Sequence, residues 1–135
     1  MYAILKAVID TSIILFSFER GFDLFEGLIH DLDESYSCII PDSVLRELMY
    51  KMIYSSIDVY RAIYRSVIPQ IVERCEMIAV SEDYEFEDAD HDLIRLSLAL
   101  KAPIATNDSE LKRVARSLGI KIIYFRESKG RLEMM

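Results

Sequence analysis

Near its start the sequence reads Tyr2-Ala3-Ile4-Leu5-Lys6-Ala7-Val8-Ile9, followed directly by Asp10-Thr11-Ser12, and this stretch decides the fold. The apolar run is rich in Ile, Val and Leu, which is typical of a strand covered on both faces of a parallel sheet. The polar triplet can cap a helix that the pattern predicts through Ile13–Phe18. The stretch therefore predicts a buried strand that leads into a helix.

Strands and helices alternate along the rest of the chain. The predicted strands are 37–40, 77–80, 103–106 and, as the last strand, 121–125. The predicted helices are 23–32, one that opens at 41–43, about 57–67 ahead of Pro69, 93–101 and 109–118; Gly21 and Gly119 end helices, and 82–92 is an acidic loop. This alternation predicts an α/β, three-layer α/β/α (Rossmann-like) fold with a central, mainly parallel sheet, in one domain spanning 1–135.

The chain is acidic overall, but its charge is unevenly distributed. It has 135 residues, 16 of them basic and 23 acidic, and a net charge of −7. That sign disfavours binding of nucleic acid by bulk charge. Residues 1–110 carry 9 basic and 21 acidic side chains, whereas 111–135 carry 7 and 2, with a basic tail at about 126–135. The C-terminal part could therefore contact phosphates although the whole chain is acidic.

The two cysteines, Cys38 and Cys75, form no CxxC pair. This spacing disfavours a disulfide scaffold or a zinc ribbon and predicts two free thiols in a reducing cytoplasm. No uncharged apolar stretch reaches the length of about 18 residues that a membrane span needs. We therefore expect a cytoplasmic protein without a membrane segment.

Polar residues follow several predicted strands, and in parallel sheets the site lies beyond these strand ends. Asp10 follows the first strand, and Thr106-Asn107-Asp108 follows the strand at 103–106. A lone aspartate in such a place is usually a helix cap. Two carboxylates on neighbouring strand ends repel each other without a cation, so their coincidence favours a metal.

Other acids carry weaker signals. Glu47 lies near the edge of an apolar helix stripe, where an ordinary boundary residue would pair with Arg46 or Lys51. Three more acids, Asp88, Asp90 and Asp92, stand at the start of an apolar helix, and the helix dipole accounts for some of them. The sequence contains no GxGxxG, GxxxxGK[ST] or GxSxG motif and no spaced histidine ligands. Oxygen ligands alone suit Mg²⁺ or Mn²⁺.

An ordered set of short motifs spans the chain. It consists of Val8-Ile9-Asp10-Thr11-Ser12, Ile40-Pro41 with Val44 and Glu47-Leu48, Asp90 at a helix start, Ala105-Thr106-Asn107-Asp108 with Leu111, and Gly119-Ile120 before the 121–125 strand. In this order the sequence resembles the PIN-domain nucleases, in their single-domain prokaryotic and archaeal form. The resemblance implies a parallel sheet between helical layers and hydrolysis of RNA phosphodiester bonds with a divalent metal.

The resemblance also implies roles for individual residues. The catalytic and metal-binding acids are Asp10, Glu47, Asp90 and Asp108, and the metal is Mg²⁺ or Mn²⁺. Asp90 is preferred because the family's third acid opens a helix about eighteen residues before the last Asp; His91 departs from the family pattern after it, and Asp88 or Asp92 could take its place. Supporting residues are Ser12, Thr106 and Asn107, with helix capping as the alternative for both hydroxyls. The predicted RNA contacts are Lys112, Arg113 and Arg116.

Four tyrosines recur on the middle helices at Tyr50, Tyr54, Tyr60 and Tyr64. They form either a partly buried core face or a protein interface, and the family resemblance favours a homodimer through them. Two functions stay open. One is a metal-dependent ribonuclease, either the toxin of a toxin–antitoxin pair, with an antitoxin protein as partner, or an RNA-processing enzyme. The other is a catalytically silent module of the same fold that binds RNA or protein.

Overall fold

A computed structural model describes residues 5–80 and 89–135, which form one six-stranded sheet flanked by helices. The strand order is β3-β2-β1-β4-β5-β6, and every pairing is parallel except that of β5 with β6. In chain order the elements are β1 Leu5–Ile9, α1 Thr11–Arg20, α2 Leu24–His30, β2 Tyr36–Pro41, α3 Asp42–Tyr54, α4 Asp58–Arg74, β3 Cys75–Ile78, α5 Ala89–Leu100, β4 Ile104–Ala105, α6 Ser109–Ser117, β5 Ile122–Arg126 and β6 Arg131–Met134. The predicted fold class is confirmed.

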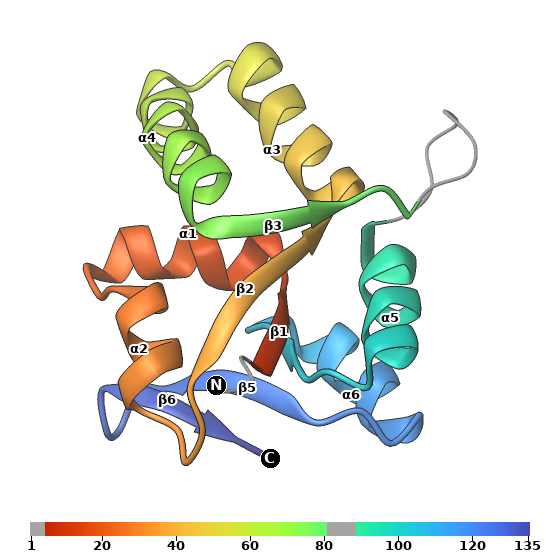
Figure 1. Ribbon diagram of the computed structural model, residues 1–135. Helices are drawn as coiled ribbons and strands as arrows, with labels where there is room; N and C mark the ends of the chain where they lie inside the picture. The colour runs from red at the N-terminus through yellow and green to blue at the C-terminus, as the bar shows by residue number, and fades with distance from the viewer. Residues whose placement is uncertain (1–4, 81–88) are drawn as a thin grey trace.

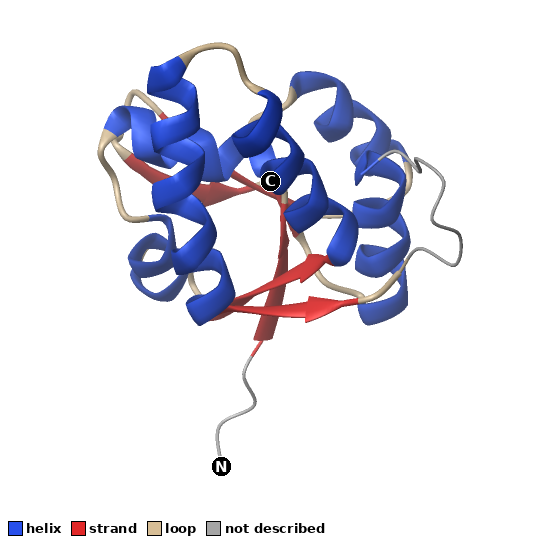
Figure 2. Cartoon of the chain, turned by 90° about the horizontal axis from the view of Figure 1, so that it is seen from above, coloured by secondary structure: helices blue, strands red, loops and turns tan. Residues whose placement is uncertain are grey.

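The sheet lies between two groups of helices (Figures 1 and 2). The chain moves from β1 to β2 to β3 through α1–α4, and then returns to β4 and β5 through α5 and α6. Because such crossovers are right-handed, the two directions of travel place the helices on opposite faces. Strand β1 lies between β2 and β4, and Ala7, Val8 and Ile9 are fully buried, as the apolar run predicts. Within the described residues no helix is both long and apolar enough to cross a membrane.

Glycine and aspartate end and begin the early helices as the sequence predicts. Gly21 ends α1 at a φ of 73°, a left-handed conformation that glycine adopts without steric cost. Asp23 then caps α2, because its side chain accepts hydrogen bonds from the amides of Phe25 and Glu26. The two helices therefore stay short and separate.

Three predicted boundaries in the middle of the chain are wrong. Helix α4 runs through Pro69, since Val67 and Ile71 on either side are buried in the core and hold the helix together despite the lost backbone bond. Strand β3 begins at Cys75, directly after α4. Helix α5 begins at Ala89, so Asp90 and Asp92 are helical rather than part of an acidic loop. The rest of that predicted loop, and residues 2–4 of the first predicted strand, lie outside the described residues.

The predicted basic tail is in fact the end of the sheet. β6 returns antiparallel to β5 through a turn in which Gly130 has a φ of 64°. Glu133 on β6 accepts a hydrogen bond from Arg126 at 3.0 Å, and this bond lowers the pKa of the Glu133 carboxyl. Leu132 is fully buried and packs so close to Gly27 of α2 that a Cβ there would lie 2.9 Å from its methyl group. The position of β6 therefore depends on its packing against α2.

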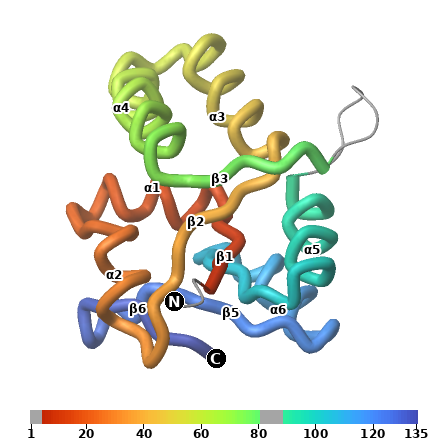
Figure 3. The backbone as a smooth tube through the Cα atoms, viewed as in Figure 1, coloured from red at the N-terminus to blue at the C-terminus, as the bar shows by residue number. Residues whose placement is uncertain are grey.

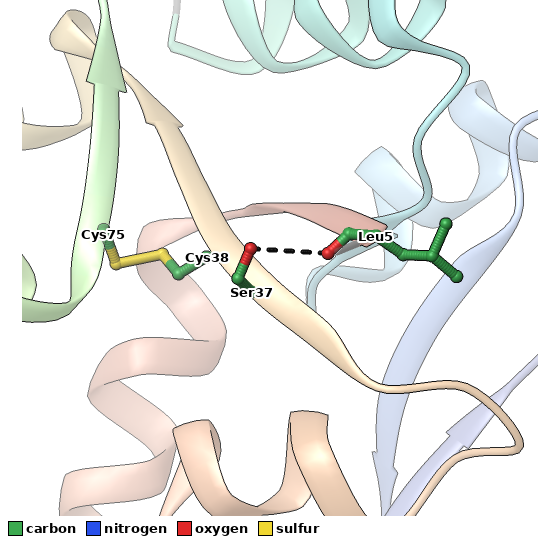
Figure 4. Close-up of a disulfide and its surroundings, with 4 residues drawn as sticks. All are labelled: Leu5, Ser37, Cys38 and Cys75. Carbon is green, nitrogen blue, oxygen red and sulfur yellow. Dashed lines mark hydrogen bonds between the residues drawn. A yellow bond between two sulfur atoms is a disulfide. The ribbon is translucent and has the colours of Figure 1, made fainter. Parts of the chain in front are cut away.

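The prediction of two free thiols is also wrong, because Cys38 and Cys75 form a disulfide (Figure 4). The two residues face each other in the register of β2 and β3, with their Cα atoms 4.6 Å apart. On the other side of β2, the hydroxyl of Ser37 donates to the carbonyl of Leu5 at 3.4 Å. The disulfide therefore ties the outermost strand to the sheet at the base of α3 and α4, which Figure 3 traces as a hairpin above β3.

Reduction of this disulfide is expected to lower the free energy of unfolding by about 3–4 kcal/mol, because the bond closes a loop between residues 37 apart in the sequence. Guanidinium unfolding with and without a reductant measures the change. The chain has no other cysteine, so a double variant with Cys38→Ala and Cys75→Ala should not respond to reductant. Unchanged unfolding of the reduced wild type would contradict this expectation.

Candidate functional site

The carboxylate of Asp10 is the centre of a buried polar network where β1 ends. It is 6% exposed, and its Oδ2 accepts hydrogen bonds from Ser12 Oγ at 2.6 Å and Thr106 Oγ1 at 2.7 Å. The parallel register pairs Ile9 with Ala105, so the next residues on the two strands, Asp10 and Thr106, become neighbours. Asp10 occupies the N-cap position of α1 but forms no capping bond. The capping interpretation of Asp10 is therefore wrong.

Burial is the main reason that the pKa of Asp10 lies above its ordinary value. The hydrogen bonds from Ser12 and Thr106 act in the opposite direction, and the nearby charge of Glu47 raises the pKa further. Burial thus disfavours the charged form of this carboxyl, and a cation bound beside it would favour the charged form.

The segment after β4 links the two strand ends through hydroxyl groups. The backbone amide of Asn107 donates to Ser12 Oγ at 3.2 Å, and the backbone amide of Asp108 donates to Thr106 Oγ1 at 3.0 Å. The Asn107 side chain accepts from the amide of Phe125 on β5 at 3.3 Å. These contacts connect β1, β4 and β5 at the edge where the parallel strands end, which we call the carboxyl edge.

Asp108 and Glu47 are both engaged in ordinary local bonds. The exposed Asp108 caps α6 by accepting from the amide of Leu111 at 2.8 Å, as the capping interpretation predicts. Glu47 is half-buried on α3, and Lys51 lies 2.9 Å from its carboxylate. Glu47 nevertheless acts on the charge of Asp10. The structure therefore brings Glu47 near Asp10. The side chain of Asp108, in contrast, bonds to the first turn of its own helix, α6.

The first turn of α5 holds the remaining acids. Asp92 is fully buried, and neither of its carboxylate oxygens has a hydrogen-bond partner within the described residues. Asp90 is half-buried, and Asp88 lies outside the described residues. Helix α5 joins the parallel strands β3 and β4, so it runs opposite to them and its first turn lies near the carboxyl edge. Asp92 is thus the more deeply buried of the two described acids in this turn.

A sequence signal for Asp92 exists. It precedes Leu96 by one helical turn and shares the buried face of α5 with Leu93, Leu96 and Ser97. A carboxylate on the apolar face of a helix is rarely buried without a partner. The spacing to Asp108, which favoured Asp90, says nothing about the face on which a side chain lies.

The oxygen donors at this edge suit a divalent cation, but within the described residues they do not form a complete ligand set. Among residues 5–80 and 89–135, no three His, Cys, Asp or Glu side chains lie close enough together to hold a metal. The buried carboxylates of Asp10 and Asp92 form no ion pair in that part of the chain. Oxygen ligands in such surroundings suit Mg²⁺ or Mn²⁺. The orphaned oxygens of Asp92 in particular lack the positive charge that burial of a carboxylate requires.

A basic stripe extends from Asp108 along α6. Lys112 and Arg116 follow Asp108 at four-residue intervals, so the three share one helix face. The Lys112 ammonium lies 5.4 Å from the centre of the Tyr124 ring. Arg113 is exposed, with Glu110 at 4.0 Å. The first of these cations, Lys112, lies one helical turn after Asp108 at the carboxyl edge.

The tyrosines of the α3–α4 hairpin are mostly exposed. Tyr50, Tyr54 and Tyr60 are 56%, 68% and 45% exposed, so the core interpretation is wrong for them. Tyr64 is partly buried against the core. The rings of Tyr50 and Tyr54 lie 4.6 Å apart on α3. These side chains form an apolar surface on the hairpin, away from the carboxyl edge.

Comparison with known proteins agrees with this arrangement. A PIN-like domain family matches residues 7–128. The PIN domain endonuclease Utp24 superposes with a TM-score of 0.77 and 27% identity, over 96% of this chain and 90% of that chain. VapBC2 from Rickettsia felis and VapBC-1 from nontypeable Haemophilus influenzae share the fold, with TM-scores of 0.63 and 0.61 and identities of 17% and 15%, over 89% and 87% of this chain and 98% and 96% of theirs.

No curated protein matches the chain. The family match extends from within β1 to just beyond β5, and it includes the hydroxyl network and the acids described above. The chain belongs to the PIN-like domain family.

Proposed function

We propose that this protein is a divalent-metal-dependent endonuclease that hydrolyses RNA phosphodiester bonds at the carboxyl edge of its sheet. The observation that carries the proposal is the burial of Asp10 and Asp92, neither of which forms an ion pair within the described residues. A buried carboxylate without an ion pair destabilises the fold, and a bound cation would offset that cost. The likeness to an endonuclease at 27% identity supports the same reaction class.

Asp10 and Asp92 would hold the metal, with Glu47 and Asp108 as ligands directly or through water. When bound, Mg²⁺ or Mn²⁺ would lower the pKa of a water molecule and neutralise charge on the attacked phosphate. Ser12 and Thr106 orient the Asp10 carboxylate, because both hydroxyls donate to its Oδ2. Asn107 holds Ser12 in place through its amide. Asp90 lies two residues before Asp92 and is the other candidate for the third acid. Substitution of each residue in turn compares the two candidates.

The basic stripe of Lys112, Arg113 and Arg116 supports RNA as the substrate. A polyanion needs cations beside an acidic centre, and this stripe begins one helical turn after Asp108. The cations would position the backbone and leave the choice of bases to other contacts. A toxin role with an antitoxin partner, an RNA-processing role and a cytoplasmic location all stay predictions.

A second candidate function is a silent module that binds RNA or protein without cutting it. The observation that favours it is that, within the described residues, no three acids are close enough to hold a metal. In such a module Asp108 would remain a helix cap and Glu47 would remain paired with Lys51. Substitution of the acids distinguishes the two functions.

Asp10→Asn and Asp92→Asn are each expected to reduce RNA cleavage in Mn²⁺ by more than about 100-fold. Loss of a mere hydrogen-bond partner of a metal ligand typically costs about 10–100-fold, and loss of a ligand costs more. Asp90→Asn should cost less than about tenfold, because Asp90 is less buried than Asp92. The exposed Asp33→Asn is the matched control. Equal cleavage by wild type and Asp10→Asn would support the silent module.

The melting temperature of the Asp10→Asn variant shows whether that variant is folded. Without metal at neutral pH it should melt at a higher temperature than wild type, because the folded wild type must ionise a carboxyl whose pKa is raised by burial. Stability of the wild type is lost as pH rises from the ordinary aspartate pKa of about 4 through this raised value. The difference in melting temperature should therefore vanish below pH of about 4.

A double variant with Arg113→Ala and Arg116→Ala is expected to weaken RNA binding by about tenfold and to leave metal binding intact. Each phosphate contact with a single strand contributes about 0.7 to the slope of log affinity against log salt, so the slope should fall by about 1.4. Fluorescence anisotropy with labelled RNA measures both quantities. Arg65→Ala with Lys101→Ala, two exposed cations away from the stripe, is the charge-matched control. Unchanged affinity would remove the stripe from the RNA site.

We also propose that the hairpin surface binds a second copy of the chain. Seven large side chains are 43–68% exposed there: Met49, Tyr50, Ile53, Tyr54, Ile57, Val59 and Tyr60. With about 200 Å² for each residue, they expose on the order of 700 Å², more than the largest apolar patch of a typical monomer. A standard interface covers about 800 Å² on each partner. The exposed area of these seven side chains therefore approaches that of a standard interface.

Light scattering is expected to give about twice the chain mass of 15.7 kDa. Ile53→Glu should convert the dimer to a monomer, because it places a charge within the apolar surface. The control is Leu98→Glu on α5, where the leucine is 50% exposed against 59% for Ile53, and it should leave the dimer intact. A monomeric wild type at high concentration would count against the interface.

A further inference from the structure

A cavity of about 600 Å³ lies at the edge of the sheet where the parallel strands begin, which we call the amino edge. Its walls include Leu5, which begins β1, Tyr36, which begins β2, and Lys121, which directly precedes β5. Asp10 follows the other end of β1, a strand of 5 residues that spans about 16 Å. The cavity is therefore separate from the site at the carboxyl edge.

The wall of this cavity is mostly aliphatic. Leu98 and Leu100 on α5 and Ile120 ahead of β5 contribute to it, and Tyr36 is the only aromatic ring among its described lining residues. Leu98 and Leu100 are 50% and 42% exposed, so a molecule that enters the cavity can cover them. Cavities of about 300–1,000 Å³ with apolar walls and a few polar groups are typical of small-molecule sites.

The charged side chains among the described lining residues are three lysines. Lys6 pairs with Glu76 on β3 at 2.9 Å. Lys101 and Lys121 are exposed, and neither forms an ion pair with a described residue. These two lysines lie just before β4 and β5, which are paired neighbours in the sheet. A chain with a net charge of −7 thus places two uncompensated cations in one cavity.

The positive charge of the cavity is concentrated at Lys101 and Lys121. Burial raises the pKa of the Tyr36 hydroxyl, and the charges of Glu34 and Asp33 raise it further, so acids lie near the Tyr36 side. The C-terminal ends of α5 and α6, which also reach the cavity, contribute about half a negative charge each. Together the two helix ends offset only part of the charge of the two lysines.

The backbone of Lys101 has an unusual conformation. Its φ is 53°, and within residues 5–80 and 89–135 it is the only non-glycine residue with a positive φ. Lys101 directly follows α5, at a position where glycine is usual because a Cβ crowds the left-handed backbone. A lysine at a position that glycine fills with less strain indicates a use for the side chain.

We propose that the cavity binds a small organic anion with an aliphatic body, whose acidic group contacts Lys101 and Lys121 and whose chain lies on Leu98 and Leu100. An ammonium group donates to carboxylate and phosphate oxygens alike, so the ligand class is defined by its charge and its apolar body together. The site is independent of RNA cleavage, because the cavity and the acids lie at opposite edges of the sheet.

An NMR titration of isotope-labelled protein with octanoate tests the site. The amide signals of Leu98, Lys101, Gly119 and Lys121 should shift with one Kd below about 1 mM, and those of the hairpin surface should not shift. Octanol carries the chain without the charge, and acetate carries the charge without the chain. Each should bind at least about tenfold more weakly than octanoate. Octyl phosphate should bind at the same amides, and its Kd relative to octanoate identifies the preferred acidic group.

Two variants test the charge and the wall separately. Lys101→Gly is expected to weaken octanoate binding by about tenfold without lowering the melting temperature, because glycine adopts the left-handed conformation freely. Leu98→Glu should abolish binding, because it places a negative charge in the cavity. The matched controls are Arg65→Gln, which removes an exposed cation on α4, and Leu118→Glu, where the leucine is 51% exposed and does not line the cavity.

Several outcomes would overturn the anion site. Equal binding of octanol and octanoate, or unchanged affinity in Lys101→Gly, would mean that the lysines only offset the helix ends. An oligouridylate that shifts the same amide signals at a lower Kd than octanoate would mean that the cavity holds RNA instead. If octanoate shifts no cavity signal while the wild type cleaves RNA, the anion site fails and the nuclease stands. Octanoate binding without cleavage in any divalent metal supports the anion site and removes the nuclease.

Discussion

The carboxylate of Asp10, held by two hydroxyl groups, is the interaction on which the rest of the site depends. Ser12 and Thr106 come from segments 94 residues apart and donate to the same oxygen, with their own oxygens 3.1 Å apart. Parallel pairing of β1 with β4 makes this contact possible, because it brings Asp10 and Thr106 to the same edge. The hydroxyls hold the carboxylate in place but do not neutralise it. The orientation of the Asp10 carboxylate is therefore set by the fold itself.

The acids Glu47 and Asp92 are positioned by helices rather than by the strands of the sheet. Glu47 lies on α3, which belongs to a helical hairpin on the outermost strand of the sheet. The Cys38–Cys75 disulfide connects that strand to β2, so it secures the base of the hairpin. Asp92 reaches the same region from the opposite face through α5. Acidic side chains thus come from both layers of helices, and β1 and β4 lie between those layers.

Particular residues mark the limit of sequence reasoning. The burial of β1 and the place of Asp10 follow from the apolar run and the triplet after it, because period and termination are local properties. The helix through Pro69 does not, since Val67 and Ile71 gain their stabilisation from the core. β6 is only four residues long, and its pairing with β5 and its contact with Gly27 come from residues distant in sequence. Asp92 stands only as an alternative in the sequence, because the spacing to Asp108 favours Asp90 and does not report which helix face is buried.

The sequence alone is enough to predict the alternation of strands and helices as far as β5, the resemblance to the family, and a set of candidate acids. These features depend on local periodicity, capping and the residue types at strand ends, all of which are written along the chain. Only the tertiary structure decided that Cys38 bonds Cys75, that Asp10 is held by hydroxyls rather than capping its helix, and that Asp92 is the buried acid. The physical reason is that register and burial depend on which segments meet in space.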